Sequence, residues 1–275
     1  MNIGWVGLGS IGTNMVRRAL EAGHNVTVFA RGKGLDEVKA AGAKVCPDYP
    51  ALAADCDFLG LCVFSDAQLR NVLFEADALA AMRAGSVVFI HTTGAPDLAR
   101  EIGGNAPTGV EVLDATFSGS ATNVLAGELT LMVGGEADAL GLTRPIFETY
   151  ASRIHHVGPL GNGQMLKLLN NLLFATNLRN AAELLRIAET QGFVCRDVAD
   201  VIQLCSGGSY AMRSFQSGRS LSAAMAASRP YLEKDVTTVA AIAAKAGIDL
   251  SALSQTVDYF SASQVGRRGS FATHE

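Results

Sequence analysis

The sequence lacks the features that mark exported, membrane-bound and nucleic-acid-binding proteins. None of its 275 residues belongs to an uncharged apolar run of about eighteen residues, so no segment is expected to cross a membrane. The first residues form neither a basic segment nor a small-residue cleavage site, which argues against a signal peptide. The formal net charge of −4 provides no basic field for nucleic acid. We therefore expect a cytoplasmic protein that binds neither membranes nor nucleic acids.

Residues that form disulfides or bind metals are also few. The 5 cysteines are scattered and form no C-x-x-C pair, which predicts reduced thiols in a cytosolic protein. His155 and His156 are adjacent and would face opposite sides of a strand, so they could not share a metal ion. No other group has the spacing of metal ligands, and no metal site is predicted.

The first 155 or so residues alternate short apolar runs with helical stretches, among them 11–22 and 66–74. Most of the apolar runs are continuous, which is typical of parallel strands covered on both faces. This pattern predicts an α/β fold with a doubly wound, Rossmann-type sheet. The expected strands are Ile3–Val6, Val26–Phe29, Phe58–Val63, Val87–Ile90 and Val110–Leu113.

The pattern changes in the second half of the chain. Residues 164–191 contain neither Gly nor Pro and predict one long central helix of roughly 40 Å. Only helical patterns follow it, so we expect an α/β domain over residues 1–160 and an all-helical domain over residues 161–275. Apolar residues occur around much of the long helix. They indicate burial, partly against a second subunit.

A glycine motif follows the first expected strand directly. It reads Gly7-Leu8-Gly9-Ser10-Ile11-Gly12 and opens a predicted helix, which is the context of a dinucleotide-binding loop. Gly7 allows a tight turn, Gly9 lets a pyrophosphate approach the backbone, and Gly12 lets helix and strand pack closely. The helix N-terminus would then face the phosphates. The alternative is a glycine-rich turn that binds no ligand.

The end of the second expected strand indicates which nicotinamide cofactor binds. An NAD site usually has Asp or Glu there to bind the ribose 2′-hydroxyl. This chain has Arg31 and Lys33 instead, and the first acidic residue after the second strand is Asp36. Both cations suit a 2′-phosphate, which favours NADP(H) over NAD(H). The alternative is that both are solvated loop cations.

A third signal surrounds Lys167, which follows Gly161 and Gly163 in the first turn of the predicted long helix. Asn171 lies one helical turn further on the same face. Leu166, Leu168 and Leu169 would give the lysine apolar surroundings, and burial favours the neutral form that serves as an acid/base. A lysine whose stem merely covers the core is the alternative, and the spacing alone favours it.

Taken together and in order, these motifs resemble the β-hydroxyacid dehydrogenases, the relatives of 3-hydroxyisobutyrate dehydrogenase and 6-phosphogluconate dehydrogenase. Residues 92–96 correspond to the family's Ser-Thr-x-Ser-Pro, and residues 114–120 to its Asp-Ala-Pro-Val-Ser-Gly-Gly. Residues 161–171 match its G-x-G-x-x-x-K-x-x-x-N signature, and Lys234-Asp235 its C-terminal Lys-Asp. Further matches are the opening from Gly7 to Val26 and the block at residues 126–135.

The resemblance implies hydride transfer between a nicotinamide cofactor and a small β-hydroxy acid or its aldehyde or keto form, in a homodimer or homotetramer. Lys167 would be the catalytic acid/base. The implied substrate-binding residues are Ser118, Gly119, Asn171 and Asp235, and Asp235 could instead orient Lys234. Besides the glycine motif, Arg31 and Lys33, the implied cofactor-binding residues are Val63, Phe64, Thr93 and Lys234.

Two departures from the family pattern, one beside the nicotinamide and one in the substrate loop, bear on the site. Val63-Phe64 replaces Leu-Pro and brings an aromatic ring near the nicotinamide. Thr116 and Ser120 replace Pro and Gly in the substrate loop, which removes a stiffener and adds a side chain. The cofactor pocket therefore matches the family better than the substrate pocket does. Two alternatives remain: an imine reductase, which usually has Asp or Tyr at the position of Lys167, and a non-catalytic nucleotide-binding relative.

Overall fold

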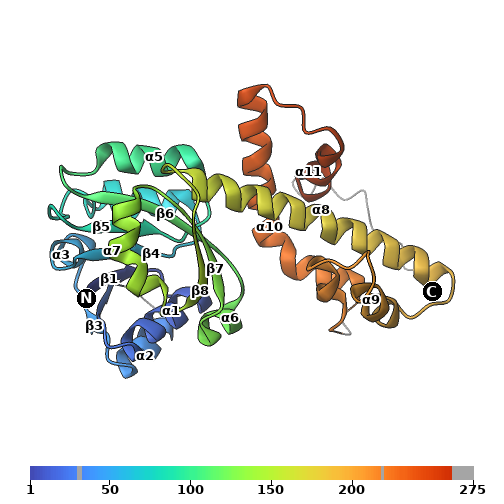
Figure 1. Ribbon diagram of the computed structural model, residues 1–275, viewed down its shortest axis with the longest axis horizontal. Helices are drawn as coiled ribbons and strands as arrows, with labels where there is room; N and C mark the ends of the chain where they lie inside the picture. Colours follow the sequence, from blue (N-terminus) through green and yellow to red (C-terminus); the bar gives the residue numbers. More distant parts are fainter. Residues whose placement is uncertain (30–32, 218–219, 262–275) are drawn as a thin grey trace. The chain divides into compact units, whose positions relative to one another are not determined.

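The computed structural model describes residues 1–29, 33–217 and 220–261 (Figure 1). Its contacts divide the chain into two compact units, Met1–Lys167 and Leu168–Glu275. The division falls inside helix α8 (Asn162–Thr190), whereas the sequence predicts a boundary at residue 160. The first six residues of α8, up to Lys167, thus belong to the α/β unit.

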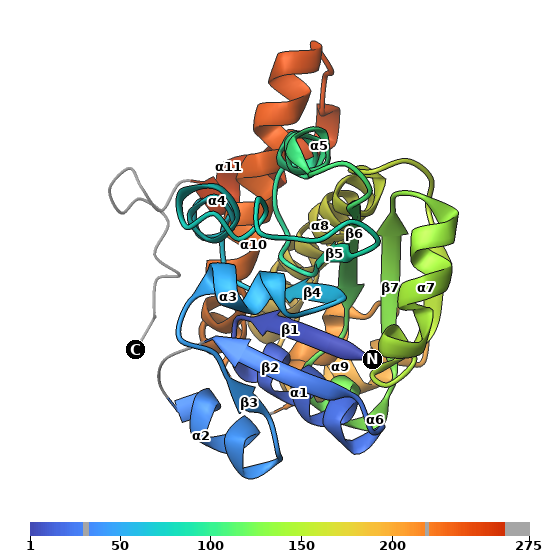
Figure 2. The same ribbon diagram turned by 90° about the vertical axis from the view of Figure 1, so that its left-hand side faces the viewer.

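The first unit is built on one eight-stranded sheet (Figure 2). The strand order is β3-β2-β1-β4-β5-β6-β7-β8, and all neighbours are parallel except β6 and β7. The Rossmann-type sheet expected from the apolar runs is therefore confirmed. The strands are β1 (Asn2–Val6), β2 (Asn25–Phe29), β3 (Lys44–Val45), β4 (Phe58–Leu61), β5 (Val87–Ile90), β6 (Glu111–Ser118), β7 (Leu129–Gly134) and β8 (Ala151–His156).

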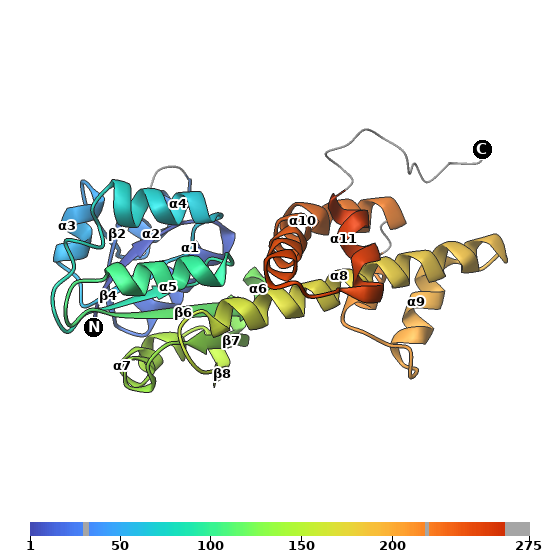
Figure 3. The ribbon, with the colours of Figure 1, turned by 90° about the horizontal axis from the view of Figure 1, so that it is seen from above.

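Alternate residues of the central strands supply two separate cores, because successive side chains point to opposite faces of a sheet. Trp5 and Phe89 lie in one core with α1 (Ser10–Glu21), α2 (Lys33–Ala40), α6 (Ala121–Ala126) and α7 (Ala137–Phe147). Val6 and Ile90 lie in the other with α3 (Tyr49–Ala54), α4 (Asp66–Arg70), the π-helix η1 (Asn71–Glu75) and α5 (Pro96–Asn105). Figure 3 shows α4 and α5 on one side of the sheet and α7 on the other.

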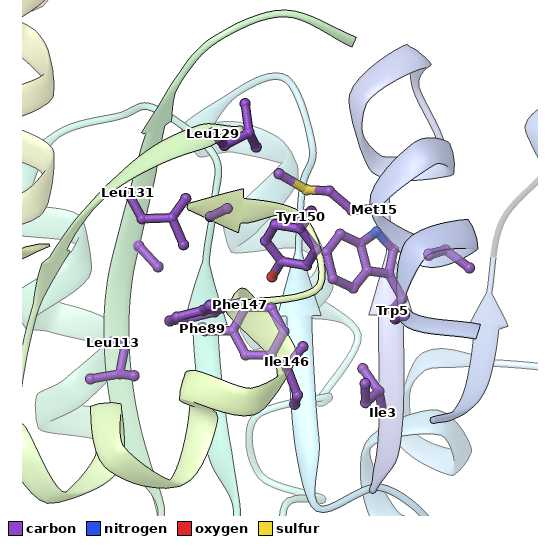
Figure 4. Packing of buried hydrophobic residues seen from close by; sticks show 14 of the residues in the cluster. Ile3, Trp5, Met15, Phe89, Leu113, Leu129, Leu131, Ile146, Phe147 and Tyr150 are labelled. Carbon is purple, nitrogen blue, oxygen red and sulfur yellow. The ribbon is translucent and has the colours of Figure 1, made fainter. Parts of the chain in front are cut away.

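Aromatic rings fill the centre of the first core (Figure 4). Phe89 meets Trp5 and Phe147 edge to face, with ring centroids 5.8 and 5.3 Å apart. The cluster also encloses the polar pair His91 and Tyr150, whose Nε2 and hydroxyl oxygen are 3.0 Å apart. Burial lowers the pKa of His91 to about 4, so the ring is neutral at physiological pH.

The second unit is helical throughout its described residues, as expected. After α8 come α9 (Cys195–Gln203), the 3₁₀ turn η2 (Ala211–Phe215), α10 (Leu221–Ala246), the 3₁₀ turn η3 (Ser251–Leu253) and α11 (Ser254–Ser261). One face of α8 is buried and carries Leu168, Leu172 and Leu178. Elsewhere on the helix, Leu173 and Ile187 are more than half exposed. Among the described residues, no helix is long and apolar enough to cross a membrane.

The sequence predicts five strands, and the sheet contains three more. It misses β3, which is two residues long, and also β7 and β8. The predicted strand over residues 110–113 is longer in the structure, because β6 extends to Ser118. Ile90 at the end of β5 pairs with Asp114, so the last four residues of β6 project beyond β5 and pair only with β7.

Candidate cofactor-binding and active site

The glycine loop joins β1 to α1 at the carboxyl edge of the parallel strands. Gly7 has φ +101°, and a Cβ atom there would lie 2.2 Å from the Cys62 carbonyl oxygen. A Cβ atom on Gly12 would lie 2.0 Å from the Gly7 carbonyl oxygen. By contrast, a Cβ atom on Gly9 would meet nothing within 4 Å. The fold thus requires Gly7 and Gly12, whereas the position of Gly9 opens onto free space, as expected where a pyrophosphate approaches the backbone.

The N-terminus of α1 fits a phosphate group. Gly9 is its N-cap residue and makes no side-chain capping hydrogen bond, and the first turn contains no acidic residue. The backbone N–H groups of this turn, from Ser10 onward, therefore face no competing carboxylate. Gly9 and Ser10 are exposed, while Leu8 and Ile11 are half-buried on either side. The Trp5 indole N–H donates a hydrogen bond to the Gly7 carbonyl oxygen at 3.1 Å, which holds the loop on β1.

The residues after β4 lie against the glycine loop, because Cys62 meets Gly7. The backbone N–H of Val63 donates to the Thr92 hydroxyl at 3.0 Å, and that of Phe64 donates to Gln68 Oε1 at 2.7 Å. Phe64 is 55% exposed at this edge. Val63 and Phe64 therefore lie beside the loop that follows β5.

That next loop, Thr92–Ala95, contains the predicted cofactor residue Thr93, which is partly exposed. The N–H of Ala95 donates to Asp66 Oδ2 at 3.0 Å, and a Cβ atom on Gly94 would lie 1.7 Å from Asp66 Oδ1. The loop is thus held against the start of α4. The ends of β1, β4 and β5, which are neighbours in the sheet, bring three of the predicted cofactor segments together.

The two cations that favour NADP(H) are only partly covered by the structure. Arg31 lies outside the described residues, and Lys33 is the first residue of α2. A Cβ atom on the next residue, Gly34, would lie 2.4 Å from the Leu8 carbonyl oxygen. Helix α2 therefore begins beside the glycine loop.

The predicted substrate loop lies at the exposed end of β6. Ser118 and Gly119 are both exposed. Gly119 has φ +137°, and a Cβ atom there would meet Leu129 Cδ2 at 2.5 Å, so any other residue would strain the loop. The hydroxyl of Ser120 donates to Asn123 Oδ1 at 2.8 Å as part of a capping box for α6. The added side chain thus serves the helix cap.

Thr116 corrects another expectation. The sequence suggested that replacing the family's proline removes a stiffener, but the buried Thr116 hydroxyl donates to the Gly163 carbonyl oxygen at 2.8 Å. Its second acceptor, the Met132 carbonyl oxygen, is farther away at 3.3 Å. Threonine therefore ties β6 to the beginning of α8.

Asp114 holds the same end of α8. Its buried carboxylate accepts hydrogen bonds from the N–H groups of Gly161 (2.8 Å) and Gln164 (2.6 Å). Burial raises the pKa of Asp114 to about 6, and these two hydrogen bonds partly offset the effect. Half-buried Lys167 follows Gln164 by three residues. Leu168 is buried, but Leu166 and Leu169 are 41% and 50% exposed, so the predicted apolar surroundings of Lys167 are incomplete.

The second unit brings three other predicted residues together. Asn171 donates from Nδ2 to Asp235 Oδ2 at 2.5 Å, and Lys234 Nζ lies 2.8 Å from Asp235 Oδ1. Asp235 is only 3% exposed, and Asn171 and Lys234 compensate its buried carboxylate. The expectation that Asp235 orients Lys234 agrees with this ion pair.

Sequence reasoning missed Asp114, Asp66 and Gln164. Asp114 gives a signal in retrospect, because an acid at the end of an apolar strand must find partners where it is buried. Asp66 and Gln164 give none, because their partners are backbone groups of a loop that is distant in sequence. Within the part of the chain that the structure describes, no three His, Cys, Asp or Glu residues are placed to hold a metal ion.

Comparisons with known proteins agree with this architecture. The family model described as the NAD binding domain of 6-phosphogluconate dehydrogenase matches residues 2–158. The one described as NAD-binding of NADP-dependent 3-hydroxyisobutyrate dehydrogenase matches residues 161–271. The NAD-dependent L-serine dehydrogenase of Pseudomonas aeruginosa is 32% identical over 232 residues, which cover 83% of this chain and 78% of that protein.

Solved structures are similar along nearly the whole chain. The structure of Mycobacterium tuberculosis 3-hydroxyisobutyrate dehydrogenase with L-serine has a TM-score of 0.83 at 27% identity, covering 95% of this chain and 94% of that one. Psf3 in complex with NADP+ and 2-OPP has a TM-score of 0.81 at 26% identity, covering 96% and 95%. A Streptomyces aurantiacus imine reductase, with a TM-score of 0.67 at 19% identity over 94% and 93%, shares the fold.

The matched models cover both units, and they agree with the glycine loop and the long helix described above. The resemblance stated from the sequence motifs is thereby confirmed. The chain belongs to the family of 6-phosphogluconate and 3-hydroxyisobutyrate dehydrogenases, the NAD(P)-dependent oxidoreductases that act on hydroxy acids.

Proposed function

We propose that the protein transfers hydride between NADP(H), in preference to NAD(H), and a small β-hydroxy acid or its aldehyde or keto form. Lys167 is the acid/base. The observation that carries the proposal is the meeting of three loops at one sheet edge, beside the first turn of α8. Gly9 leaves room for a ligand there, and Gln164, three residues before Lys167, bonds to the Thr92–Ala95 loop.

A nicotinamide bound at this edge would supply the hydride acceptor for oxidation of the carbinol carbon and the hydride donor for reduction of the carbonyl carbon. The neutral amine of Lys167 removes the hydroxyl proton during oxidation, and its ammonium returns a proton to the carbonyl oxygen during reduction. Each direction therefore moves one proton at Lys167 Nζ and one hydride at carbon. Asn171, one helical turn further on α8, is proposed to meet the substrate, held by its hydrogen bond to Asp235.

The acid end of the substrate is assigned to the Ser118 hydroxyl and the Gly119 N–H. Both lie at the exposed end of β6, and hydroxyl and backbone N–H donors suit a carboxylate. The names of the relatives support small substrates, because the Pseudomonas protein is called an L-serine dehydrogenase and the Mycobacterium structure contains L-serine. L-serine is itself a β-hydroxy acid. It belongs in a test panel with 3-hydroxyisobutyrate and L-threonate.

The cofactor preference rests on Arg31 and Lys33, with no acid between Phe29 and Asp36. The start of α2 beside Leu8 supports it, as does the NADP+ in the Psf3 structure, whereas the Pseudomonas relative is named NAD-dependent. Replacing both cations by Ala should weaken NADPH binding by about 1–3 kcal/mol per lost charged hydrogen bond and leave NADH binding nearly unchanged. Isothermal titration measures both. Equal affinities of the wild type would contradict the preference.

The test of mechanism is Lys167→Ala, assayed by nicotinamide absorbance with a substrate that the wild type uses. We expect turnover to fall by about 10²–10⁴-fold, with little change in cofactor affinity or melting temperature. Lys167→Arg should also be inactive in alcohol oxidation, because guanidinium stays protonated. Lys245→Ala, at an exposed lysine of α10, is the matched control. Near-normal turnover of Lys167→Ala would exclude lysine catalysis, and turnover only with cyclic imines would favour an imine reductase.

Association with a second copy of this chain is the remaining part of the proposal. Apolar side chains along α8 and α9 are more than half exposed, among them Leu173, Ile187 and Val201, which suits burial against another subunit. We expect a homodimer or homotetramer in the cytoplasm, where the five unpaired cysteines would remain reduced. Sedimentation as a monomer at micromolar concentration would contradict this expectation.

A further inference from the structure

We infer that Gln164 is a positioning residue, which sets the cofactor loop Thr92–Ala95 and the first turn of α8 at a fixed spacing. The inference rests on the proposed function, in which Thr93 meets the cofactor and Lys167 moves the proton. Gln164 belongs to the first turn of α8 and is 2% exposed, so it contacts neither solvent nor substrate directly.

The side-chain amide of Gln164 bonds on both sides of Thr93. Its Nε2 donates to the Thr92 carbonyl oxygen at 2.7 Å, and its Oε1 accepts the Gly94 N–H at 2.8 Å. A carbonyl can only accept and a backbone N–H can only donate, so the partners fix which end of the amide is which. The side chain thus pairs with the loop as a neighbouring strand would.

The backbone of Gln164 is held just as firmly. Its N–H donates to Asp114 Oδ2 at 2.6 Å, and the preceding residue, Gly163, accepts from the Thr116 hydroxyl at 2.8 Å. A Cβ atom on Gly163 would lie 2.4 Å from the Asp114 carbonyl oxygen, so helix and strand are in close contact at this turn. The side chain therefore extends from a fixed backbone.

The Thr92–Ala95 loop, to which Gln164 bonds, makes two further hydrogen bonds with residues that follow β4. The Thr92 hydroxyl accepts the Val63 N–H, and Asp66 accepts the Ala95 N–H, each at 3.0 Å. Gln164 joins this loop to α8 through these two hydrogen bonds. Thr93 lies within the gripped segment, and Lys167 lies three residues beyond Gln164, so loss of the amide would loosen cofactor and proton-transfer groups together.

A buried polar side chain could instead serve only stability. The two roles differ in what each predicts for folded protein. A stability role lowers the unfolding temperature but leaves cofactor affinity and turnover per folded molecule intact. A positioning role weakens cofactor binding and lowers turnover at saturation in molecules that remain folded.

The test uses the full chain with Gln164→Met, which keeps the length but makes neither hydrogen bond, and Gln164→Glu. Thr143→Val is the control, because Thr143 is fully buried in α7, and its hydroxyl bonds only within that helix, at 2.8 Å to Ala139. Three quantities are measured: hydrogen exchange of the Gly94 amide in the free protein, the NADPH dissociation constant, and kcat. In Gln164→Met we expect Gly94 exchange and the dissociation constant each to rise about 10-fold, and kcat to fall about 10–100-fold.

The Gln164→Glu variant makes the NADPH affinity depend on pH in a way that a purely stabilising role of Gln164 does not predict. Its protonated carboxyl can donate to Thr92 and accept from Gly94 as glutamine does, but the ionised form faces the Thr92 carbonyl without a donor. NADPH affinity should therefore approach the wild-type value at low pH and weaken as this carboxyl ionises. Asp66 and Asp114 lie at the same turn in every variant, so the wild type and Gln164→Met supply the baseline from which the change in Gln164→Glu is measured.

Each outcome decides the role of Gln164. If Gln164→Met matches Thr143→Val in Gly94 exchange and NADPH affinity, the positioning role is overturned. The same conclusion follows if the NADPH affinity of Gln164→Glu changes with pH as that of the wild type does. A wild-type protein that oxidises no hydroxy acid would refute the proposed function instead, and the exchange and affinity measurements would still decide the positioning role.

Discussion

Replacement of Gly9 by alanine separates what the ligand requires from what the fold requires. A Cβ atom at this position meets nothing within 4 Å, and φ is −72°, a value that alanine adopts freely. The free protein therefore has room for the added methyl group. A pyrophosphate at the N-terminus of α1 would meet that group directly.

Two small effects on stability oppose each other in the Gly9→Ala variant. Alanine restricts the unfolded chain and stabilises the protein by about 0.4–1 kcal/mol. As an N-cap residue, alanine is less favourable than glycine by up to about 1 kcal/mol. The free energy of unfolding should therefore change by less than about 1 kcal/mol. Cofactor binding should weaken by about 2 kcal/mol or more, a factor of roughly 30, because contacts to a charged phosphate are lost.

Thermal unfolding of the free variant and isothermal titration with NADPH and NADH measure the two quantities. Gly141→Ala is the control for an unobstructed glycine, because it lies in α7 with nothing within 4 Å of its Cβ position. Gly12→Ala is the opposite control and should unfold the protein, since its Cβ would lie 2.0 Å from a backbone oxygen. If Gly9→Ala binds both cofactors as the wild type does, the pyrophosphate does not lie on this loop.

Three further predictions concern buried charge and the substrate loop. Burial lowers the pKa of His91 from 6.5 to about 4 and raises that of Asp114 from 3.8 to about 6. As the pH falls from 6.5 to 4, His91 should cost the folded state up to about 3 kcal/mol, and as it rises from 3.8 to 6, Asp114 should cost a similar amount. Urea unfolding at pH 4–7 should show a weaker loss of stability at acid pH in His91→Gln and a stronger one in Asp114→Asn. Equal slopes in all three proteins would contradict both assignments. Asp235→Ala leaves a lysine and an amide without their shared partner and should lower the free energy of unfolding by about 2 kcal/mol in chemical denaturation; an unchanged midpoint would show that water replaces the carboxylate. Ser118→Ala should raise KM about 10-fold at an unchanged cofactor dissociation constant, and a clearer result is expected than with Gly119→Val, which strains a backbone at φ +137°; an unchanged KM would remove Ser118 from the substrate site.

The cofactor half of the fold could be predicted from sequence because its strands are central. Residues 3–6 and 87–90 are buried on both faces of the sheet, and residues 26–29 alternate buried with half-buried side chains. The edge strand β8 reads Ala-Ser-Arg-Ile-His-His, with four of its six side chains exposed, and it has no such signal. Strand β7 is apolar, but nothing local shows that it runs antiparallel to β6.

The candidate site was predictable only where a residue type is tied to a local motif. The glycine loop is contiguous, so its spacing alone specifies its geometry. The hydrogen bonds of Gln164 and Asp114 span 47 to 72 residues, and no periodicity reports such distances. The surroundings of Lys167 were predicted incorrectly for a related reason, since helical spacing does not reveal which leucines the tertiary structure covers.

The projection of β6 beyond β5 has a consequence for the design of variants. Beyond the Ile90–Asp114 pair, the strand is bonded only to β7, and the two form a hairpin closed by α6. Segment 117–128 lies outside the bonds that Asp114 and Thr116 make with α8, although its helix α6 packs against α1. A transplanted hairpin tip would have to keep Phe117 and Val124, which pack in the first core, and a glycine at position 119. Under the proposed function, exchanging this one contiguous stretch of gene tests whether the hairpin tip sets the substrate preference.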